Sequence, residues 1–261
     1  MAKSSSGKSS HRCPVKAKMR TVTCEKCELH GFLHILGGMV HGEESLLEKL
    51  LIRQQPVPKG ETLFRERHPF YAIFAVKSGS FKSYTTDNQE ERVLGFHLPG
   101  ELLGLDAFLS PAYSSTVRAL EESEVCTLAI RDLAISESDL TKVQTQVIRV
   151  LTHQINEERR QSLLAARRTA EERLAAFLLN ISDRYQKRGL PGDIFRLTML
   201  RPDIANFLGL AMETVSRILQ RFREQELLSI NGKQVQLLDI PCLQAIARTC
   251  PNPPGAPPST S

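Results

Sequence analysis

Between Pro56 and Ile130 the chain alternates short β-rich runs with turn residues. Val, Ile, Phe, Tyr and Thr recur within the runs, and Gly, Asn, Asp and Ser separate them. Strands at this spacing are typical of an antiparallel barrel or jelly roll, and the density of turns excludes a helical domain. The runs expected to form strands are ETLF, YAIFAVKSG, SFKSYTTD, ERVLGFHL, STVRALE and SEVCTLAI.

A long stretch without Gly or Pro follows, residues 139–169, and it predicts one extended helix. Ile148, Leu151 and Ile155 recur there at the three-to-four-residue spacing of a seam between paired helices. Glu158 continues that seam, so a charged residue falls where an apolar one is expected. We therefore expect this helix to pair with its own copy in a homodimer.

The C-terminal part has the order helix, helix, bend, helix, hairpin. Ala170–Arg188 is amphipathic, and Arg201–Phe222 reads as two short helices with Gly209 at the bend between them. Two β-runs joined by Asn231-Gly232 then predict a hairpin, and a short helix follows it. This order is that of a winged helix-turn-helix. The positions expected to be buried are Ile204, Ala205, Phe207, Leu208, Val215, Ile218, Leu219 and Phe222.

The second helix of the bend would leave Glu213, Ser216 and Arg217 together on its outer face, because residues three and four apart share a face. A recognition helix reads base edges in the major groove with side chains near its N-terminal end. Arg can bond guanine through two hydrogen bonds, Glu can accept from the cytosine amino group, and Ser suits either partner. The alternative is a solvated ion pair between Glu213 and Arg217. Phosphate contacts are expected from Arg221, Arg223 and Lys233.

Composition fits a DNA-binding protein but does not demand one. The 261 residues carry a formal net charge of +5, and 41% are hydrophobic. No apolar run approaches the ~20 residues needed to cross a bilayer, and no apolar segment follows the basic N-terminus, so we expect a cytoplasmic protein with no membrane partner. The sequence offers no nucleophile–base pair, Gly-rich phosphate loop or paired carboxylates that would indicate an enzyme.

The fold class expected is α+β, an N-terminal antiparallel β-roll joined by a long helix to a C-terminal winged helix-turn-helix. Within the N-terminal part, the leucine spacing of Glu44–Arg53 predicts a helix. The segments expected are a flexible, basic, cysteine-bearing N-terminus (1–43), a sensor roll (44–138), a dimerisation helix (139–169), a DNA-binding domain (170–249) and a disordered tail (250–261).

Long ordered matches make the chain similar to the CRP/FNR family of bacterial regulators, specifically its FNR branch. They include "LTMLRPDIANFLGLAMETVSRILQRF", "GFHLPGELLGLDAF", "RALEESEVC" and "AEERLAAF". The resemblance implies a cyclic-nucleotide-binding-like roll, double-stranded DNA and RNA polymerase as partners, and half-sites similar to TTGAT. The Glu-x-x-Ser-Arg pattern of that family is intact as Glu213, Ser216 and Arg217.

The resemblance raises cAMP as a ligand, and the sequence argues against it. In cAMP-binding relatives an Arg-Ser pair holds the cyclic phosphate after a Gly-Glu-Leu turn. Here Gly100-Glu101-Leu102 is present, but the pair is Tyr113-Ser114. A buried phosphate without its counter-charge is costly, so we expect no cAMP binding.

The resemblance also implies an iron–sulfur cluster, of the 4Fe-4S type, held by three N-terminal cysteines and one from the roll. Cys24, Cys27 and Cys126 match that pattern, and thiolates suit such clusters. The third N-terminal cysteine is replaced by His34, and histidine can ligate cluster iron. Cys13 or His30 are alternatives at this position. We take Cys242 and Cys250 as structural or incidental.

Glu158 on a twofold axis would meet its own copy, and the resulting repulsion would hold the dimer near its switching point. We expect cluster assembly under low oxygen to favour association. The alternative for Glu158 is a solvent-facing side chain. Alternatives for the whole chain are a regulator of the same family without a cluster, controlled by thiol oxidation, by another ligand or not at all, and an interaction module whose helix-turn-helix serves only packing.

Overall fold

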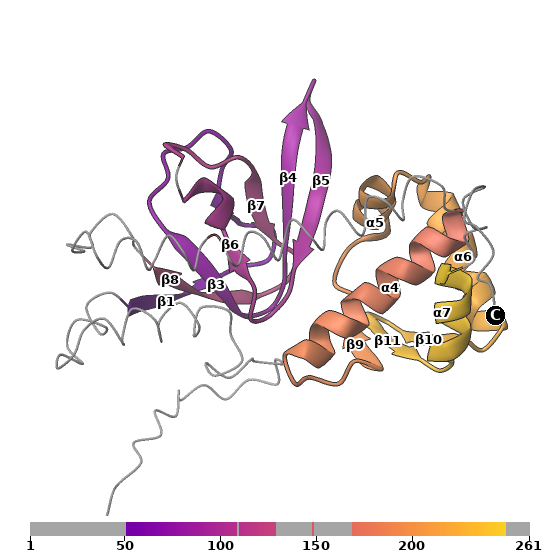
Figure 1. The fold of residues 1–261 in the computed structure, drawn as a ribbon. Helices are drawn as coiled ribbons and strands as arrows, with labels where there is room; N and C mark the ends of the chain where they lie inside the picture. The colour runs from indigo at the N-terminus through magenta and orange to yellow at the C-terminus, as the bar shows by residue number, and fades with distance from the viewer. Residues whose placement is uncertain (1–50, 109, 129–147, 149–168, 249–261) are drawn as a thin grey trace, which may run out of the picture.

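The structure, a computed structural model, describes residues 51–108, 110–128, 148 and 169–248. A β-roll and a helical unit with a small sheet lie side by side, as Figure 1 shows, and the α+β class expected from the sequence is confirmed. No helix among these residues has the length and apolarity needed to span a bilayer.

Two four-stranded antiparallel sheets form the roll, with strand orders β1-β8-β3-β6 and β2-β7-β4-β5. Each of the six runs predicted as strands coincides with one, although β5 begins one residue before its run, at Glu90. The sequence reading missed only β1 and the two-residue β6. The elements are β1 (Leu51–Val57), β2 (Thr62–Phe64), β3 (Ile73–Ser78), β4 (Phe81–Asp87), β5 (Glu90–His97), β6 (Leu102–Leu103), the 3-10 helix η2 (Leu105–Ala107), β7 (Thr116–Ala119) and β8 (Ser123–Leu128).

Strand β1 corrects one expectation. The leucine spacing predicted a helix over Glu44–Arg53, but Leu51–Arg53 belong to β1, which pairs antiparallel with β8 from Leu51↔Leu128 to Val57↔Ser123. Pairing with a strand more than sixty residues away overrides the local helical pattern. β1 lies at the edge of its sheet, which is where a strand tolerates Pro56.

The C-terminal unit has the predicted winged-helix order. α4 begins with a capping box, in which Thr169 and Glu172 each bond the backbone N–H of the other. One turn differs from the prediction. Asn231 pairs with Gln234 in the hairpin, so the turn residues are Gly232, with φ +60°, and Lys233. The elements are α4 (Ala170–Lys187), β9 (Ile194–Arg196), α5 (Arg201–Leu208), α6 (Met212–Glu224), β10 (Leu228–Asn231), β11 (Gln234–Leu237) and α7 (Ile240–Arg248), with sheet order β10-β11-β9.

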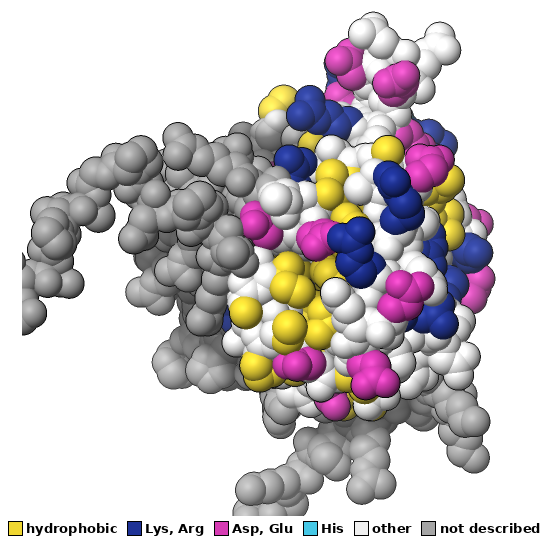
Figure 2. Space-filling view, turned by 90° about the vertical axis from the view of Figure 1, so that its right-hand side faces the viewer, with side chains coloured by type: hydrophobic (Ala, Val, Ile, Leu, Met, Phe, Trp, Pro, Cys, Tyr) yellow, Lys and Arg dark blue, Asp and Glu magenta, His cyan; other side chains and the backbone are white. Residues whose placement is uncertain are grey.

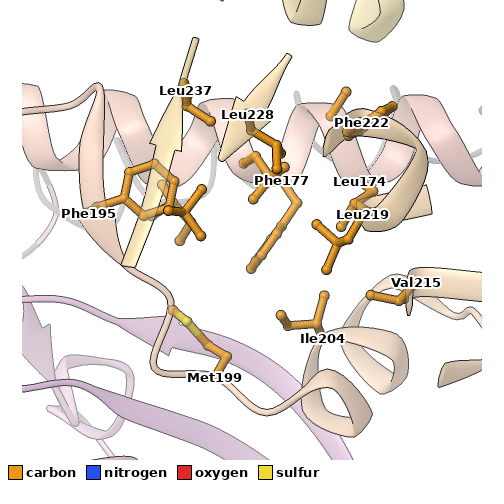
Figure 3. Close-up of a cluster of buried hydrophobic side chains, with 14 of the residues drawn as sticks. Leu174, Phe177, Phe195, Met199, Ile204, Val215, Leu219, Phe222, Leu228 and Leu237 are labelled. Atoms are coloured by element: carbon orange, nitrogen blue, oxygen red, sulfur yellow. The ribbon is translucent and has the colours of Figure 1, made fainter. Parts of the chain in front are cut away.

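One apolar core fills the C-terminal unit and continues into the roll. Figure 3 shows its centre, where side chains from α4, α5, α6 and the small sheet converge. Val93, Phe96, Leu98 and Leu120 of the roll belong to the same cluster. The two units are therefore packed against each other through a common apolar surface, whose burial stabilises both.

The predicted dimerisation helix lies almost entirely outside the described residues, as do Leu151, Ile155, Glu158 and the N-terminal segment with Cys13, Cys24, Cys27, His30 and His34. Ile148 is described: it is helical and its side chain is 61% exposed in the single chain. The segment boundaries expected from the sequence stay predictions.

Candidate nucleic-acid interface

The helix-turn-helix is built by three local features of the sequence. Pro202 lies in the first turn of α5, where a missing N–H costs no helical hydrogen bond. Gly209 ends α5 with φ +63°, a conformation that side chains with a Cβ rarely adopt. Arg173 of α4 donates to the carbonyl of Leu208 at 3.1 Å and so holds the end of α5. α6 starts three residues after Gly209, at the angle that this turn sets.

α6 is divided sharply into a buried and an exposed side. Val215, Ile218, Leu219 and Phe222, the four residues predicted for its core stripe, are all buried. α5 is packed less completely than expected, since Ile204 and Ala205 are buried but Phe207 and Leu208 are only partly so. Because α6 is anchored through one stripe, its opposite side is free of the protein's own core.

The three predicted base-reading residues lie on that opposite side. Glu213 and Arg217 are exposed and Ser216 is partly exposed. The guanidinium of Arg217 donates to the hydroxyl of Thr214 at 3.4 Å. Within the described part of the chain, no ion pair joins Arg217 to Glu213. The alternative, a surface salt bridge between Glu213 and Arg217, is therefore not formed between these two side chains.

The side chains expected at phosphates come from α6 and from the hairpin that follows it. Arg221 is 58% exposed and forms an ion pair with Glu171 in the first turn of α4, a partner that the sequence reading missed. Arg223 donates to Gln220 at 3.3 Å. Lys233 lies in the turn of the β10–β11 hairpin, which is the wing of the winged helix. The structure thus places two of these cations on α6 and one in the β10–β11 turn, and Arg221 has an acidic partner.

Figure 2 shows the molecule from the side on which α6 and α7 lie in Figure 1. Basic side chains are spread over this face among acidic ones and an apolar patch. The charge on this face is mixed, so attraction to a polyanion would depend on a few well-placed arginines rather than on a uniform positive field.

The interior of the roll is filled by aromatic side chains around Tyr113. Its ring stacks on Phe64 with centroids 3.9 Å apart, and it is 2% exposed. Its hydroxyl donates to the Ala72 carbonyl at 2.7 Å. The neighbouring Ser114 hydroxyl donates to the carboxylate of Asp106. The Tyr113-Ser114 pair is thus committed to contacts within the protein.

Glu101, from the Gly-Glu-Leu turn, is 8% exposed and bonded to α4. Its carboxylate accepts from Arg184 Nε at 2.8 Å, lies 3.5 Å from Arg188 Nη2 and accepts from the Leu98 N–H at 3.0 Å. Burial alone would raise the pKa of Glu101, but Arg184 and Arg188 outweigh burial and lower it to about 2. This ion cluster joins the roll to the C-terminal unit.

Cys126 lies in the middle of β8 with Val125 beside it in sequence. Val125 is fully buried in the roll core, and side chains of successive strand residues point to opposite faces. Cys126 is partly exposed, opposite Gln54 of β1 and Ala75 of β3. Its side chain packs against the margin of the roll core and is only partly accessible. Among the described residues, no group of three His, Cys, Asp or Glu side chains is arranged to hold a metal ion.

Family models match both units of the chain. A Crp-like helix-turn-helix domain matches residues 172–246, and a cyclic nucleotide-binding domain matches residues 54–134. The arrangement of a recognition-type helix beside a wing, attached to such a roll, defines a DNA-binding transcription regulator rather than an enzyme.

Whole-chain relatives make the assignment specific. The chain is 40% identical to the transcriptional activator protein anr of Pseudomonas aeruginosa, over 86% of this chain and 92% of that one. It is 37% identical to the fumarate and nitrate reduction regulatory protein of Vibrio cholerae, over 84% and 87% respectively. The solved structure of FixK2 from Bradyrhizobium japonicum matches with a TM-score of 0.69 and 26% identity, covering 77% of this chain and 99% of that one. The protein belongs to the CRP/FNR family of transcription regulators, in its FNR branch.

Proposed function

We propose that the protein is an oxygen- or redox-responsive regulator that binds TTGAT-like palindromes as a homodimer through Glu213, Ser216 and Arg217. The main support for DNA recognition is that α6 buries one stripe of side chains in the core and leaves these three on its opposite, accessible side. Side chains near the N-terminal end of such a helix read base edges in the major groove. A regulator of DNA acts in the cytoplasm, and a family of transcriptional activators acts through RNA polymerase, which is the second partner we propose.

Fluorescence anisotropy with a labelled TTGAT palindrome and a scrambled duplex of the same length tests the DNA part. We expect tighter binding to the palindrome than to the scrambled duplex. The affinity for both duplexes should fall as the salt concentration rises, because contacts to phosphates release counterions. Arg221, Arg223 and Lys233 are the proposed phosphate contacts. Equal affinity for the two duplexes at every salt concentration would contradict the proposal.

We propose that the sensor is an iron–sulfur cluster of the 4Fe-4S type held by Cys24, Cys27, His34 and Cys126. The thiol of Cys126 is compatible with this role, since it is partly exposed at the margin of the roll core. The other three ligands lie outside the described residues. When bound, the cluster would supply oxygen-sensitive chemistry, and the chain's part is to provide thiolate and imidazole ligands.

Anaerobic reconstitution followed by iron and sulfide analysis and visible spectroscopy tests the cluster. We expect Cys126→Ser to lose the bound iron and sulfide, because a serine hydroxyl replaces a soft thiolate ligand. The matched control is Cys242→Ser, a partly buried cysteine of α7 that should keep the full cluster content. His34→Ala and Cys13→Ala then identify the remaining ligand. Wild-type protein with no iron or sulfide would instead favour the cluster-free regulator, controlled by thiol oxidation or another ligand.

The dimer is proposed to form along Ile148, Leu151, Ile155 and Glu158. The exposed side chain of Ile148 is consistent with a surface that a second copy covers. Two Glu158 carboxylates at ~6 Å in a medium of effective dielectric ~20 would repel by about 3 kcal/mol before screening. A repulsion of this size holds a two-state equilibrium close to its midpoint.

Glu158→Ala should therefore be dimeric in air, where we expect the wild-type protein to be monomeric, and sedimentation velocity measures the difference. The control is Glu157→Ala, which removes the neighbouring charge and should leave the protein monomeric. A Glu158→Ala protein that stays monomeric would show that repulsion at this position does not set the oligomeric state.

We propose that cAMP is not the effector. Tyr113 occupies the roll interior with its ring, and Ser114 is bonded to an acidic side chain that would repel a phosphate. Glu101 is already neutralised by Arg184. Binding of cAMP would have to break these contacts, and isothermal titration should give no heat of binding at millimolar nucleotide.

A further inference from the structure

The helix-turn-helix is fastened to the roll by polar contacts that are separate from the shared apolar core. They join α5 to β4 and β5, the last two strands in the sheet order β2-β7-β4-β5. The outer edge of β5 has no neighbouring strand among the described residues, so its backbone groups need other partners. α5 supplies them.

The side-chain amide of Asn206 binds the free edge of β5 as an adjacent strand would. Its side-chain oxygen accepts from the Val93 N–H at 2.8 Å, and its side-chain nitrogen donates to the Glu91 carbonyl at 2.8 Å. A side-chain amide offers one acceptor and one donor group, as a peptide unit of an adjacent strand would. Both bonds form in only one orientation of that amide, so the contact is directional.

Asp203, one helical turn before Asn206, makes the second attachment. Its carboxylate lies 2.7 Å from Nζ of Lys82 in β4, and the same ammonium lies 2.7 Å from Glu91 in β5. The Lys82 side chain is 8% exposed. Burial would lower the pKa of Lys82, but its bonds to Asp203 and Glu91 outweigh burial and raise it, so the ammonium stays charged.

Two attachment points one turn apart, one on β5 and one on β4, restrict both the rotation and the translation of α5 on this hairpin. The apolar contacts at this interface, such as Phe96 against Phe207 with centroids 5.3 Å apart, bring the units together but carry little directional information. Hydrogen bonds weaken steeply when they are misaligned. Since the Gly209 turn joins α5 to α6, an α5 fixed on β5 also fixes the direction of α6 (Figure 1).

We infer that Asp203 and Asn206 are positioning residues, which lock the helix-turn-helix onto the β4–β5 edge of the roll and thereby set the direction in which α6 is presented to DNA. This inference rests on the proposed function of α6. In a dimer, both recognition helices must meet their half-sites at once, so a fixed direction favours simultaneous binding. Neither residue is expected to touch a base.

Electron–electron distance measurements on the full-length chain test the lock without DNA. Spin labels on noncanonical amino acids at Lys59 of the roll and Gln225 at the end of α6 leave the six native cysteines in place. We expect a narrow distance distribution for the parent protein and a distribution at least about twice as wide for Asn206→Ala and for Asp203→Asn. The control Gln244→Ala, an exposed residue of α7, should leave the width unchanged.

Affinity for DNA provides the second readout. Variants that loosen the attachment of α5 should bind the full palindrome about tenfold more weakly. Their binding to a single half-site should be nearly unchanged, because only simultaneous binding of both half-sites needs the fixed direction of α6. Should Asn206→Ala fail to fold, Asn206→Asp keeps the side-chain size, presents an anion to the Glu91 carbonyl and should widen the distribution equally. Widths equal to the parent's in all folded variants overturn the inference. Widening in a protein that binds neither duplex would leave the lock standing and refute the proposed function instead.

Discussion

Replacing Arg217 with Ala should weaken binding to the palindrome by at least about 30-fold and by up to ~10⁴-fold. A two-bond contact from arginine to guanine is worth about 1–3 kcal/mol of discrimination against a wrong base, and a dimer loses the contact in both half-sites. The Arg217 side chain is exposed and its described hydrogen bond, to Thr214, is long and local. Its removal should therefore leave the free energy of unfolding unchanged within about 0.5 kcal/mol.

Two arginines provide matched controls in the same anisotropy measurement. Arg65 is exposed on the roll, and Arg65→Ala should bind the palindrome as the parent does. Arg223→Ala should weaken the palindrome and the scrambled duplex alike, since a phosphate contact carries no sequence information. An Arg217→Ala protein with the parent's preference for the palindrome would mean that another residue reads the sequence.

Replacing Glu101 with Gln should lower the free energy of unfolding at pH 7 by about 3–5 kcal/mol, since breaking a buried ion pair leaves uncompensated charge behind. The carboxylate faces Arg184 and Arg188, whose side chains are 22% and 10% exposed. Denaturant titration measures the loss. Glu90→Gln, at an exposed position of β5, is the control and should change stability little.

Acid should destabilise the protein through the same cluster. The pKa of His97 is lowered to about 4, chiefly by burial, so protonation favours the unfolded chain as pH falls from 6.5 towards 4. The pKa of Glu101 is lowered to about 2, so its stabilisation is present above pH 4.5 and is lost as pH falls towards 2. The difference between parent and Glu101→Gln should therefore shrink below pH 4.5. A difference that stays constant down to pH 3 would show that the Glu101 charge is not what stabilises the cluster.

The parts of the fold that were predictable from sequence are those governed by local periodicity. The buried stripe of α6 follows from the 3.6-residue period at Val215, Ile218, Leu219 and Phe222. The runs of the roll were predictable because turn residues separate them. At Leu51–Arg53 the local pattern gave a helix, whereas pairing with β8 gives a strand. No local feature of those residues reports that distant partner.

The candidate site also has residues that local spacing predicts and residues whose roles depend on distant partners. Glu213, Ser216 and Arg217 could be placed on one face from spacing alone, and that face is exposed. Asn206 looked like an ordinary polar helix residue, and only the edge of β5 gives its amide a role. Glu101 matched a nucleotide-binding turn in sequence, but its partner Arg184 comes from a helix more than eighty residues later. The contacts between the two units could therefore not be predicted from the sequence.

The most direct test of DNA reading by α6 replaces each guanine of the TTGAT half-sites with 7-deazaguanine, which lacks the N7 acceptor, in binding experiments with the parent protein and with Arg217→Ala. We predict that the substitution weakens the parent by about 1–3 kcal/mol per half-site and leaves Arg217→Ala nearly unaffected, because the variant has already lost the guanidinium that N7 would accept from. Equal losses in the two proteins, or no loss in the parent, would contradict the assignment of Arg217 as the residue that reads guanine.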